Sequence, residues 1–209
     1  MKKSKAILMA LCAVLLVAAS VMGTLAYLTS TDSVTNTFTV GKVEITLDEA
    51  DVNADGTPVQ GADRVDANEY HLLPGHTYAK DPIIHVDANS EKCYLFVKVV
   101  NEIAAIEEKG TTEAPAATTV AAQMTANGWK AVDGQTGVFV YTKNTENPFA
   151  VAGGENVTVF EKFIIDDDVD NATLANYSNK KITVTAYAIQ ADGFADETAA
   201  DIWTTANFT

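Results

Sequence analysis

The sequence predicts an all-β protein built as an antiparallel sandwich or barrel. Seven or eight short runs rich in Val, Ile, Thr, Phe and Tyr follow one another along the chain, and turn residues separate most of them. No repeat at a fixed period stands out. Short β-rich runs at this spacing are typical of antiparallel β domains.

The first part of the chain has the pattern of a secretory signal peptide. Three lysines precede an apolar run from Ala6 to Met22, and the small residue Ala26 follows that run. We therefore expect a signal peptidase to cleave between Ala26 and Tyr27 during export. This gives a signal peptide over 1–26 and a single β-sandwich domain over 27–209.

An uncleaved signal anchor is the alternative for this leader. Continued to Leu28, the apolar run reaches 23 residues, which is long enough to cross a bilayer. Either outcome leaves most of the chain outside the cytoplasm. We expect a secreted protein, extracellular or at the cell surface, that contacts the membrane only through the signal peptide before cleavage.

The chain is acidic. Its formal net charge of −14 becomes −17 when the three leader lysines are removed. Nucleic-acid binding requires a basic surface, so nucleic acid is excluded as a partner. The acidity favours solubility outside the cell, and divalent cations are the partner class that so many carboxylates suit.

The domain is expected to begin with an N-terminal arm and a first strand over 27–47. In "TFTVGKVEITL" the apolar residues fall on even positions up to Val40 and on odd positions from Val43 to Leu47. Since side chains alternate along a strand, this change of phase requires one extra residue, and Gly41 suits a bulge. The acidic stretch that follows lacks a core face and is predicted to be a long loop.

The middle of the chain predicts three strands. We expect a short one before a turn at Pro74 and Gly75, a second over Ile83 to Val86, and a third over Cys93 to Val100. The third is apolar on both faces, which indicates a central strand covered on both sides. Cys93 is the only cysteine outside the leader, so an internal disulfide is excluded. We expect a small buried hydrophobic residue there, with a reactive or intermolecular thiol as the alternative.

Segment 102–128 interrupts the β pattern. Residues 102–109 and 118–127 are expected to form short helices, joined by a connection rich in Thr, Ala and Pro. The segment is predicted to be a short peripheral helical insertion. Strands resume with "GVFVYTK", "NVTVFEKFII" and "KITVTAYAIQ", and a short helix is expected near the C-terminus.

The sequence offers little for catalysis. It contains no HExxH zinc motif, no GxSxG elbow and no glycine-rich phosphate loop, so we predict no catalytic residues and no enzyme activity. His71, His76 and His85 lie within 15 residues. They are either ordinary strand and loop residues or a zinc site formed across a hairpin.

A calcium site is the best inorganic hypothesis. "DVNADG" matches the first half of a calcium-binding loop, with Asp51, Asn53 and Asp55 as the candidate ligands and Gly56 for the sharp turn. The full motif requires Glu at its twelfth position, where Ala62 stands. We therefore predict no cofactor, and leave calcium open beside a plain acidic turn. A second carboxylate cluster consists of Asp166, Asp167, Asp168 and Asp170.

Three stretches carry a family resemblance. They are "GTLAYLTSTD" with "TNTFTVGKVEITLDE" at the start, "LLPGHTYAKDPIIHVDANSEKCYLFVKV" in the middle, and "ITVTAYAIQADGF" near the end. In this order they resemble the TasA and camelysin family of biofilm-matrix and cell-surface proteins of Gram-positive bacteria. The resemblance implies a jelly-roll β-sandwich, export through a dedicated ER-type signal peptidase, and assembly into extracellular fibres. Segment 102–129 lies outside it.

The same resemblance assigns a role to the N-terminal arm. In the fibres of that family, the N-terminal segment of one subunit is thought to complete the sheet of the next by β-strand addition. The partner would be a second copy of the chain or a related matrix protein, and a head-to-tail contact of this kind yields a filament. Pairing of the arm within its own domain is the alternative. The implied assembly residues are Tyr27, Leu28, Val34, Phe38 and Val40.

The expected function is therefore a non-enzymatic structural subunit of an extracellular biofilm-matrix or cell-surface fibre. Two alternatives remain open. One is a camelysin-like cell-surface metallopeptidase, and the other is a monomeric, calcium-dependent adhesive module.

Overall fold

The computed structural model describes residues 2–27, 41–109 and 118–208, and the chain divides into two units, 1–40 and 41–209. The described part of the first unit is one helix, α1 (Lys2–Tyr27), which covers the expected signal peptide. None of the helices in the described ranges combines the length and apolar character needed to span a bilayer.

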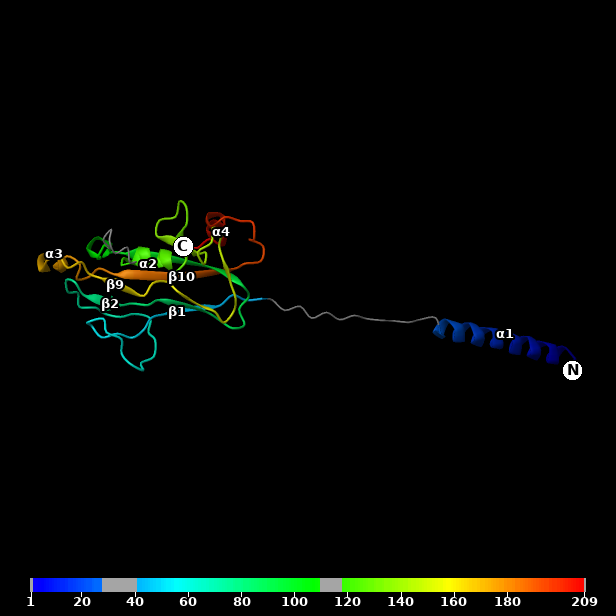
Figure 1. Ribbon diagram of the computed structural model, residues 1–209. Helices are drawn as coiled ribbons and strands as arrows, with labels where there is room; N and C mark the ends of the chain where they lie inside the picture. Colours follow the sequence, from blue (N-terminus) through cyan, green and yellow to red (C-terminus); the bar gives the residue numbers. More distant parts are fainter. Residues whose placement is uncertain (1, 28–40, 110–117, 209) are drawn as a thin grey trace. The chain divides into compact units, whose positions relative to one another are not determined.

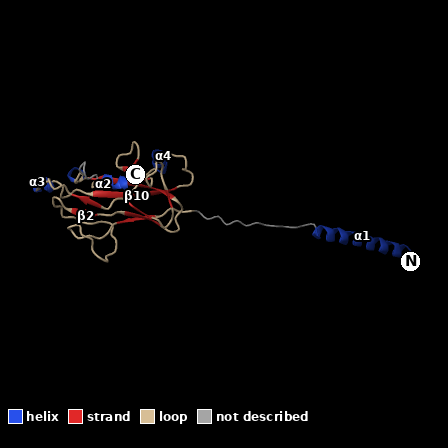
Figure 2. Ribbon diagram, in the orientation of Figure 1, coloured by secondary structure: helices blue, strands red, loops and turns tan. Residues whose placement is uncertain are grey.

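The second unit consists mainly of antiparallel strands (Figure 2). The strands in the described ranges are β1 (Ile45–Asp48), β2 (Thr77–Ala79), β3 (Ile83–Val86), β4 (Cys93–Asn101), β5 (Trp129–Ala131), β6 (Val138–Tyr141), β7 (Ala150–Val151), β8 (Asn156–Thr158), β9 (Lys162–Ile164) and β10 (Ile182–Gln190). The helices are the 3-10 turn η1 (Ala104–Ile106), α2 (Val120–Ala126), α3 (Asn171–Ala175) and α4 (Ala199–Ala206).

The strands form two main sheets and a two-stranded extension. The smaller main sheet has the order β1-β3-β8, and the larger has the order β10-β4-β6-β5 with β7 also paired to β4. β2 pairs with β9. The two main sheets form two layers, and Figure 1 shows β1 in one and β10 in the other. β1 contacts β10 at one side, and Trp129 of β5 bonds to Thr158 of β8 at the other. The fold is all-β, as predicted, with the antiparallel sheets of a β-sandwich-like arrangement.

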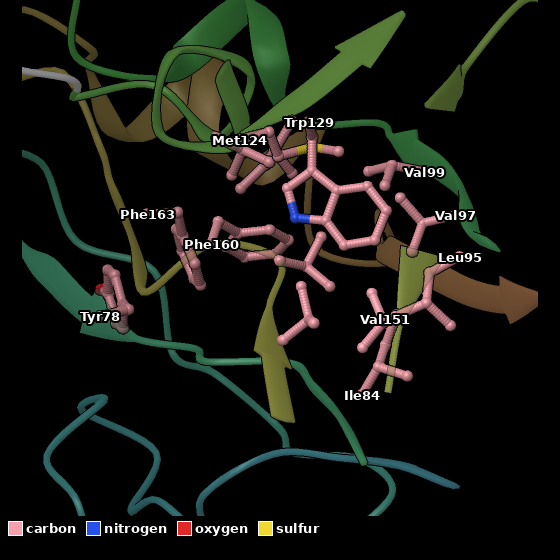
Figure 3. Packing of buried hydrophobic residues seen from close by; sticks show 14 of the residues in the cluster. Tyr78, Ile84, Leu95, Val97, Val99, Met124, Trp129, Val151, Phe160 and Phe163 are labelled. Carbon is pink, nitrogen blue, oxygen red and sulfur yellow. The ribbon is translucent and has the colours of Figure 1, made fainter. Parts of the chain in front are cut away.

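The main hydrophobic core lies between the two sheets. Leu95 and Val97 of β4, Ile84 of β3, Trp129 and Phe160 belong to one cluster, and Figure 3 shows Ile84 toward Val151 and Leu95, and Val97 toward the Trp129 ring. The nine residues of β4 pair with β10 along their whole length, from Cys93 opposite Gln190 to Asn101 opposite Ile182. β-branched and aromatic residues suit such a paired, covered strand.

The other face of β4 is covered by α4. Thr198 caps this helix by accepting the backbone N–H of Asp201, at 3.2 Å. Trp203 of α4 packs on Phe96 of β4 and on Tyr187 of β10, with ring centroids 5.7 and 5.1 Å apart. The prediction that β4 is buried on both sides is therefore confirmed, as are the positions of β3, α2 and the C-terminal helix.

The segment predicted as a peripheral insertion contributes to the core, which corrects the prediction for its described parts. Ile103, Ile106, Val120 and Met124 are all buried in the main cluster. The amide of Gln123 in α2 donates to the carbonyl of Lys162 at 2.8 Å and accepts the backbone N–H groups of residues 161 and 162 at 3.1 Å. The described ends of segment 102–128 therefore both belong to the core: α2 closes one side of the sandwich, whereas Ile103 lines the groove beside β10.

Two strand predictions were wrong. "NVTVFEKFII" is not one strand, because Val159 and the next residue, Phe160, are both fully buried, which breaks the alternation and leaves β8 and β9 in different sheets. The strand expected before Pro74 lies after it, as β2, because the backbone before the turn bonds irregularly to the preceding loop. β1 begins only at Ile45, and the part of the expected first strand before Gly41 lies outside the described residues.

Candidate functional site: a groove between two sheet edges

A groove of about 1290 Å³ runs along the side of the sandwich where β1 faces β10. Leu47 of β1 forms part of one wall, and Ile182 and Val184 of β10 form part of the other. Tyr70 and Leu72, from the loop before β2, also line it. All five of these side chains are partly buried against the main core, so they give the groove an apolar part. Polar and charged side chains, among them Glu69, Lys180 and Lys181, line the rest of it.

The groove lies between two edge strands. β1 is the edge of the smaller sheet and β10 is the edge of the larger one. An edge strand presents backbone N–H and C=O groups to whatever lies beside it. β10 is nine residues long, so the edge on this side is extended, and its first three residues line the groove.

Ion pairs lie at the end of β1, where Asp48 lines the groove. Arg64 bonds to the carboxylates of Asp48 and Asp81, the latter at 3.0 Å. Nε2 of His85 lies 3.0 Å from the Asp48 carboxylate. Desolvation of Asp48 opposes its ionisation, but the hydrogen bonds from Arg64 and His85 outweigh this effect and lower the pKa of Asp48.

A second pair lies deeper. Nζ of Lys80 is 2.5 Å from Oε2 of Glu49, and their side chains are 11% and 5% exposed. Asn68 donates from Nδ2 to Oε1 of Glu49 at 2.9 Å. Burial raises the pKa of the nearby Tyr70 hydroxyl, and the negative charges of Glu49 and Asp81 raise it further, so Tyr70 stays protonated. Sequence reasoning missed this cluster because it treated residues 48–69 as a loop without a buried face.

The candidate calcium residues form a closed turn. Nδ2 of Asn53 donates to the hydroxyl of Thr57 at 3.1 Å, and Asp55 accepts both the backbone N–H and the hydroxyl of Thr57 at 3.0 and 2.6 Å. Gly56 has φ +78°, and a Cβ there would lie 2.6 Å from the ring of Tyr78. The sequence DG is therefore accounted for by the turn and its contact with Tyr78. Calcium binding by Asp51, Asn53 and Asp55 stays a prediction.

The three histidines do not form a shared site in the described part of the chain. His85 bonds to Asp48 and to Asn156, whereas Nε2 of His76 lies 2.7 Å from the carbonyl oxygen of Asp55. No group of potential metal ligands within the described ranges contains His71, His76 or His85. The hypothesis of a zinc site across a hairpin is therefore not supported.

One cluster of carboxylates does come together in the described part of the chain. Glu108, Asp166 and Asp167 each offer a ligand atom within 4.8 Å of the others. An isolated antiparallel bridge between Glu107 and Ile165 brings them together. The acidic run was identified from the sequence, but Glu108 was missed because its partners lie more than 50 positions away. Asp170 instead caps α3, accepting the backbone N–H of Thr173 at 2.7 Å.

The remaining predicted residues fall into two groups. Cys93 is fully buried, as predicted, and burial raises the pKa of its thiol to about 11. Ala26 and Tyr27, at the expected cleavage site, are the last residues of α1. The assembly residues Leu28, Val34, Phe38 and Val40 lie outside the described residues.

Comparison with known proteins gives no relative to set beside these features. No family model, no curated protein and no solved structure matches the chain.

Proposed function

We propose that this chain is a secreted structural subunit of extracellular biofilm-matrix or cell-surface fibres, and that it assembles by β-strand addition. The observation that carries the proposal is the groove between the edge strands β1 and β10. A strand added there gains main-chain hydrogen bonds from an edge and places alternate side chains against the apolar part of the groove. The jelly-roll topology implied by the family resemblance belongs to this proposal.

The occupant is the N-terminal arm of another copy. Signal-peptide cleavage between Ala26 and Tyr27 frees residues 27–40 as a terminal segment. In an extended strand, residues two apart share a face. Leu28, Val34, Phe38 and Val40 all have even numbers, so they fall on one face and offer apolar side chains to the groove.

The geometry of this contact determines the form of the assembly. The donor is at the start of one subunit and the acceptor is on the side of the next, so the contact is head-to-tail. A head-to-tail contact that does not close into a ring produces a filament. The arm can also come from a related matrix protein, in which case the purified chain stays monomeric until that protein is added.

Removal of the arm tests the proposal. We compare the mature chain 27–209 with the chain 41–209 by electron microscopy and by urea unfolding. Donation predicts loss of fibres with little change in the free energy of unfolding of the monomer. Fibres from the 41–209 chain would refute donation, and a large loss of monomer stability would show that the arm pairs within its own domain.

A competing peptide gives a second readout. A synthetic peptide of residues 27–40, added in excess to the mature chain, is expected to cap the grooves and shorten the fibres. A control peptide in which Phe38 and Val40 are replaced by Asp keeps the length but loses the apolar face. Equal inhibition by both peptides would argue against the apolar part of the groove as the acceptor. The assay is run with calcium and with chelator, so that any calcium requirement is seen.

A further inference from the structure

The side chains of Lys80, Glu49 and Asn68 form a three-membered cluster. The two oxygens of Glu49 are bound by different groups: Oε2 by Nζ of Lys80 at 2.5 Å, and Oε1 by Nδ2 of Asn68 at 2.9 Å. An amine and an amide, separated by 12 positions in the chain, are thus held on one carboxylate. This arrangement holds a potential nucleophile and a potential electrophile on the two oxygens of one proton acceptor.

The cluster is shielded from water. The side chains of Glu49 and Lys80 are 5% and 11% exposed. Because Nζ of Lys80 lies 2.5 Å from Oε2 of Glu49, this carboxylate is placed to accept a proton from the amine directly. The neutral amine is the nucleophilic form of lysine.

The amide of Asn68 is held in place by hydrogen bonds at both of its polar atoms. Its Oδ1 accepts the backbone N–H of Val52 at 3.0 Å, and its Nδ2 donates a second bond to the carbonyl of Ala50 at 2.8 Å. A backbone N–H on the carbonyl oxygen polarises the amide carbon and stabilises the oxyanion that forms when an amine adds to it. The bonds from Nδ2 prevent rotation of the amide.

We propose that Lys80 and Asn68 form an intramolecular isopeptide bond, with Glu49 as the proton shuttle. Glu49 takes a proton from the Lys80 ammonium, and the free amine adds to Cγ of Asn68. Glu49 passes this proton to Nδ2, then removes the second proton from Nζ and gives it to the departing ammonia, which leaves as ammonium. The Nζ–Cγ bond forms and the Cγ–Nδ2 bond breaks, Glu49 ends ionised as it began, and the reaction requires no oxidant and no other co-reactant.

Other lysine–carboxylate pairs in the described ranges lack these conditions. The side chains of Lys130 and Glu146 are 52% and 92% exposed, and those of Lys180 and Glu102 are 45% and 38% exposed. Water competes for the charges of such pairs. Glu49, Asn68 and Lys80 also line the groove, which gives the released ammonia a path to solvent. The inference does not depend on the proposed function, because the bond forms within one subunit.

Peptide mass spectrometry of the purified full chain tests the inference. Trypsin cleaves after Arg64, Lys80 and Lys92, so an unlinked chain yields peptides 65–80 and 81–92. A linked chain is not cleaved after the acylated Lys80 and yields one peptide, 65–92, lighter by the mass of one ammonia. Further digestion after Glu69 separates the halves of an unlinked peptide, whereas the linked halves stay joined. Recovery of peptide 65–80 at its full mass, with no joined product, would overturn the inference.

Three variants assign the roles. Lys80→Arg keeps a cation without the nucleophile, and Glu49→Gln keeps the shape without the proton acceptor; both are expected to give no joined peptide. Asn68→Asp is expected to lose water instead of ammonia and to give a joined peptide of the wild-type mass. Lys42→Arg, at an exposed pair, is the matched control and leaves the link intact. A link formed to the same extent in Glu49→Gln would refute the role of Glu49.

Discussion

The two long sides of the sandwich are built differently. At the closed side, β5 and α2 connect the two sheets: Nε1 of Trp129 donates to the carbonyl of Thr158 at 2.9 Å, and Gln123 bonds to the backbone at residues 161 and 162. At the open side, β1 and β10 border the groove, and charged side chains line one end of it. Hydrogen bonds between neutral groups join the sheets at the closed side. At the open side, apolar side chains and ion pairs border the groove.

The difference also concerns the strands themselves. β5 has three residues, and its central Lys130 is exposed. A short edge that carries a lysine resists pairing with other chains. β10 has nine residues, and its lower part borders the groove. The larger sheet therefore has a short, lysine-bearing edge at β5 and a long edge at β10, and the proposed strand addition would use the β10 edge.

A charge in the groove is expected to have the largest effect. Val184→Glu places a carboxylate in the apolar part of the groove, where an added strand would bury it unpaired, so fibres should be lost in electron micrographs. Ala131→Glu also introduces a carboxylate, but at the β5 edge, and should leave fibre formation unchanged. Urea unfolding checks that both monomers are folded, and Val184→Ile should assemble normally. Abundant fibres from a folded Val184→Glu protein would contradict the comparison.

Loss of the amide at the closed side should be the next largest effect. Gln123→Leu removes the partner of two backbone N–H groups and one carbonyl at a part-buried position, which is expected to lower the free energy of unfolding by about 1–2 kcal/mol. The measurement is urea unfolding followed by circular dichroism. Gln60→Leu, at an exposed position, should change the stability by less than about 0.5 kcal/mol. Equal effects of the two changes would show that Gln123 does not seal the sandwich.

A similar effect is expected at Trp129. Trp129→Phe keeps an aromatic ring in the core but removes the donor to Thr158, which leaves a carbonyl unsatisfied and a partly empty site. The expected cost is about 1–2 kcal/mol, measured by thermal and urea unfolding. If the closed side is independent of the groove, fibres should form at temperatures where the variant is folded. Failure of the folded variant to assemble would show that the two sides are coupled.

The smallest expected effect is a pH-dependent loss of stability when Asp48, at the open side, is replaced. The folded-state pKa of Asp48 is lowered, so its contribution to stability is present above its ordinary pKa of about 4 and is lost as the pH falls through the lower folded value. Asp48→Asn should therefore cost about 1 kcal/mol at pH 7, and progressively less as the pH falls below the ordinary carboxyl pKa of about 4. Glu44→Gln, at an exposed carboxylate, is the control. The cost of Gln123→Leu should stay constant over this range, because no titrating group is changed.

The sequence predicted the elements whose signals are local. β4 was recognised from an apolar run, and α2 and the C-terminal helix from short stretches of helical composition. The pattern failed where tertiary contacts decide the structure, as at Phe160, whose burial directly after Val159 reflects the packing of two sheets. The alternation of apolar and polar residues along a strand does not show at which residue the chain leaves one sheet and enters another.

The site was harder to predict than the fold for the same reason. The groove requires β1 and β10 to be edges on the same side, and these strands are more than 130 positions apart. The cluster at Glu49 joins residues 19 and 31 positions away, inside a stretch whose acidic composition suggested an exposed loop. In the sequence, Lys80 stands out only as part of the stretch that resembles the TasA and camelysin family. Its contact with Glu49 depends on how the loop before β2 folds, which the sequence pattern does not reveal.

The buried thiol of Cys93 has a consequence for how an assembled fibre could be studied. Cys93 lies opposite Val151 and Gln190, and burial raises the pKa of its thiol to about 11, so the reactive thiolate is scarce while β4 stays paired. A thiol reagent then modifies it only when the sheet opens. The rate of modification therefore reports how often the sheet of a single subunit opens. If the protein forms fibres as proposed, comparing this rate in relaxed and stretched fibres would show whether mechanical force unfolds the sandwich.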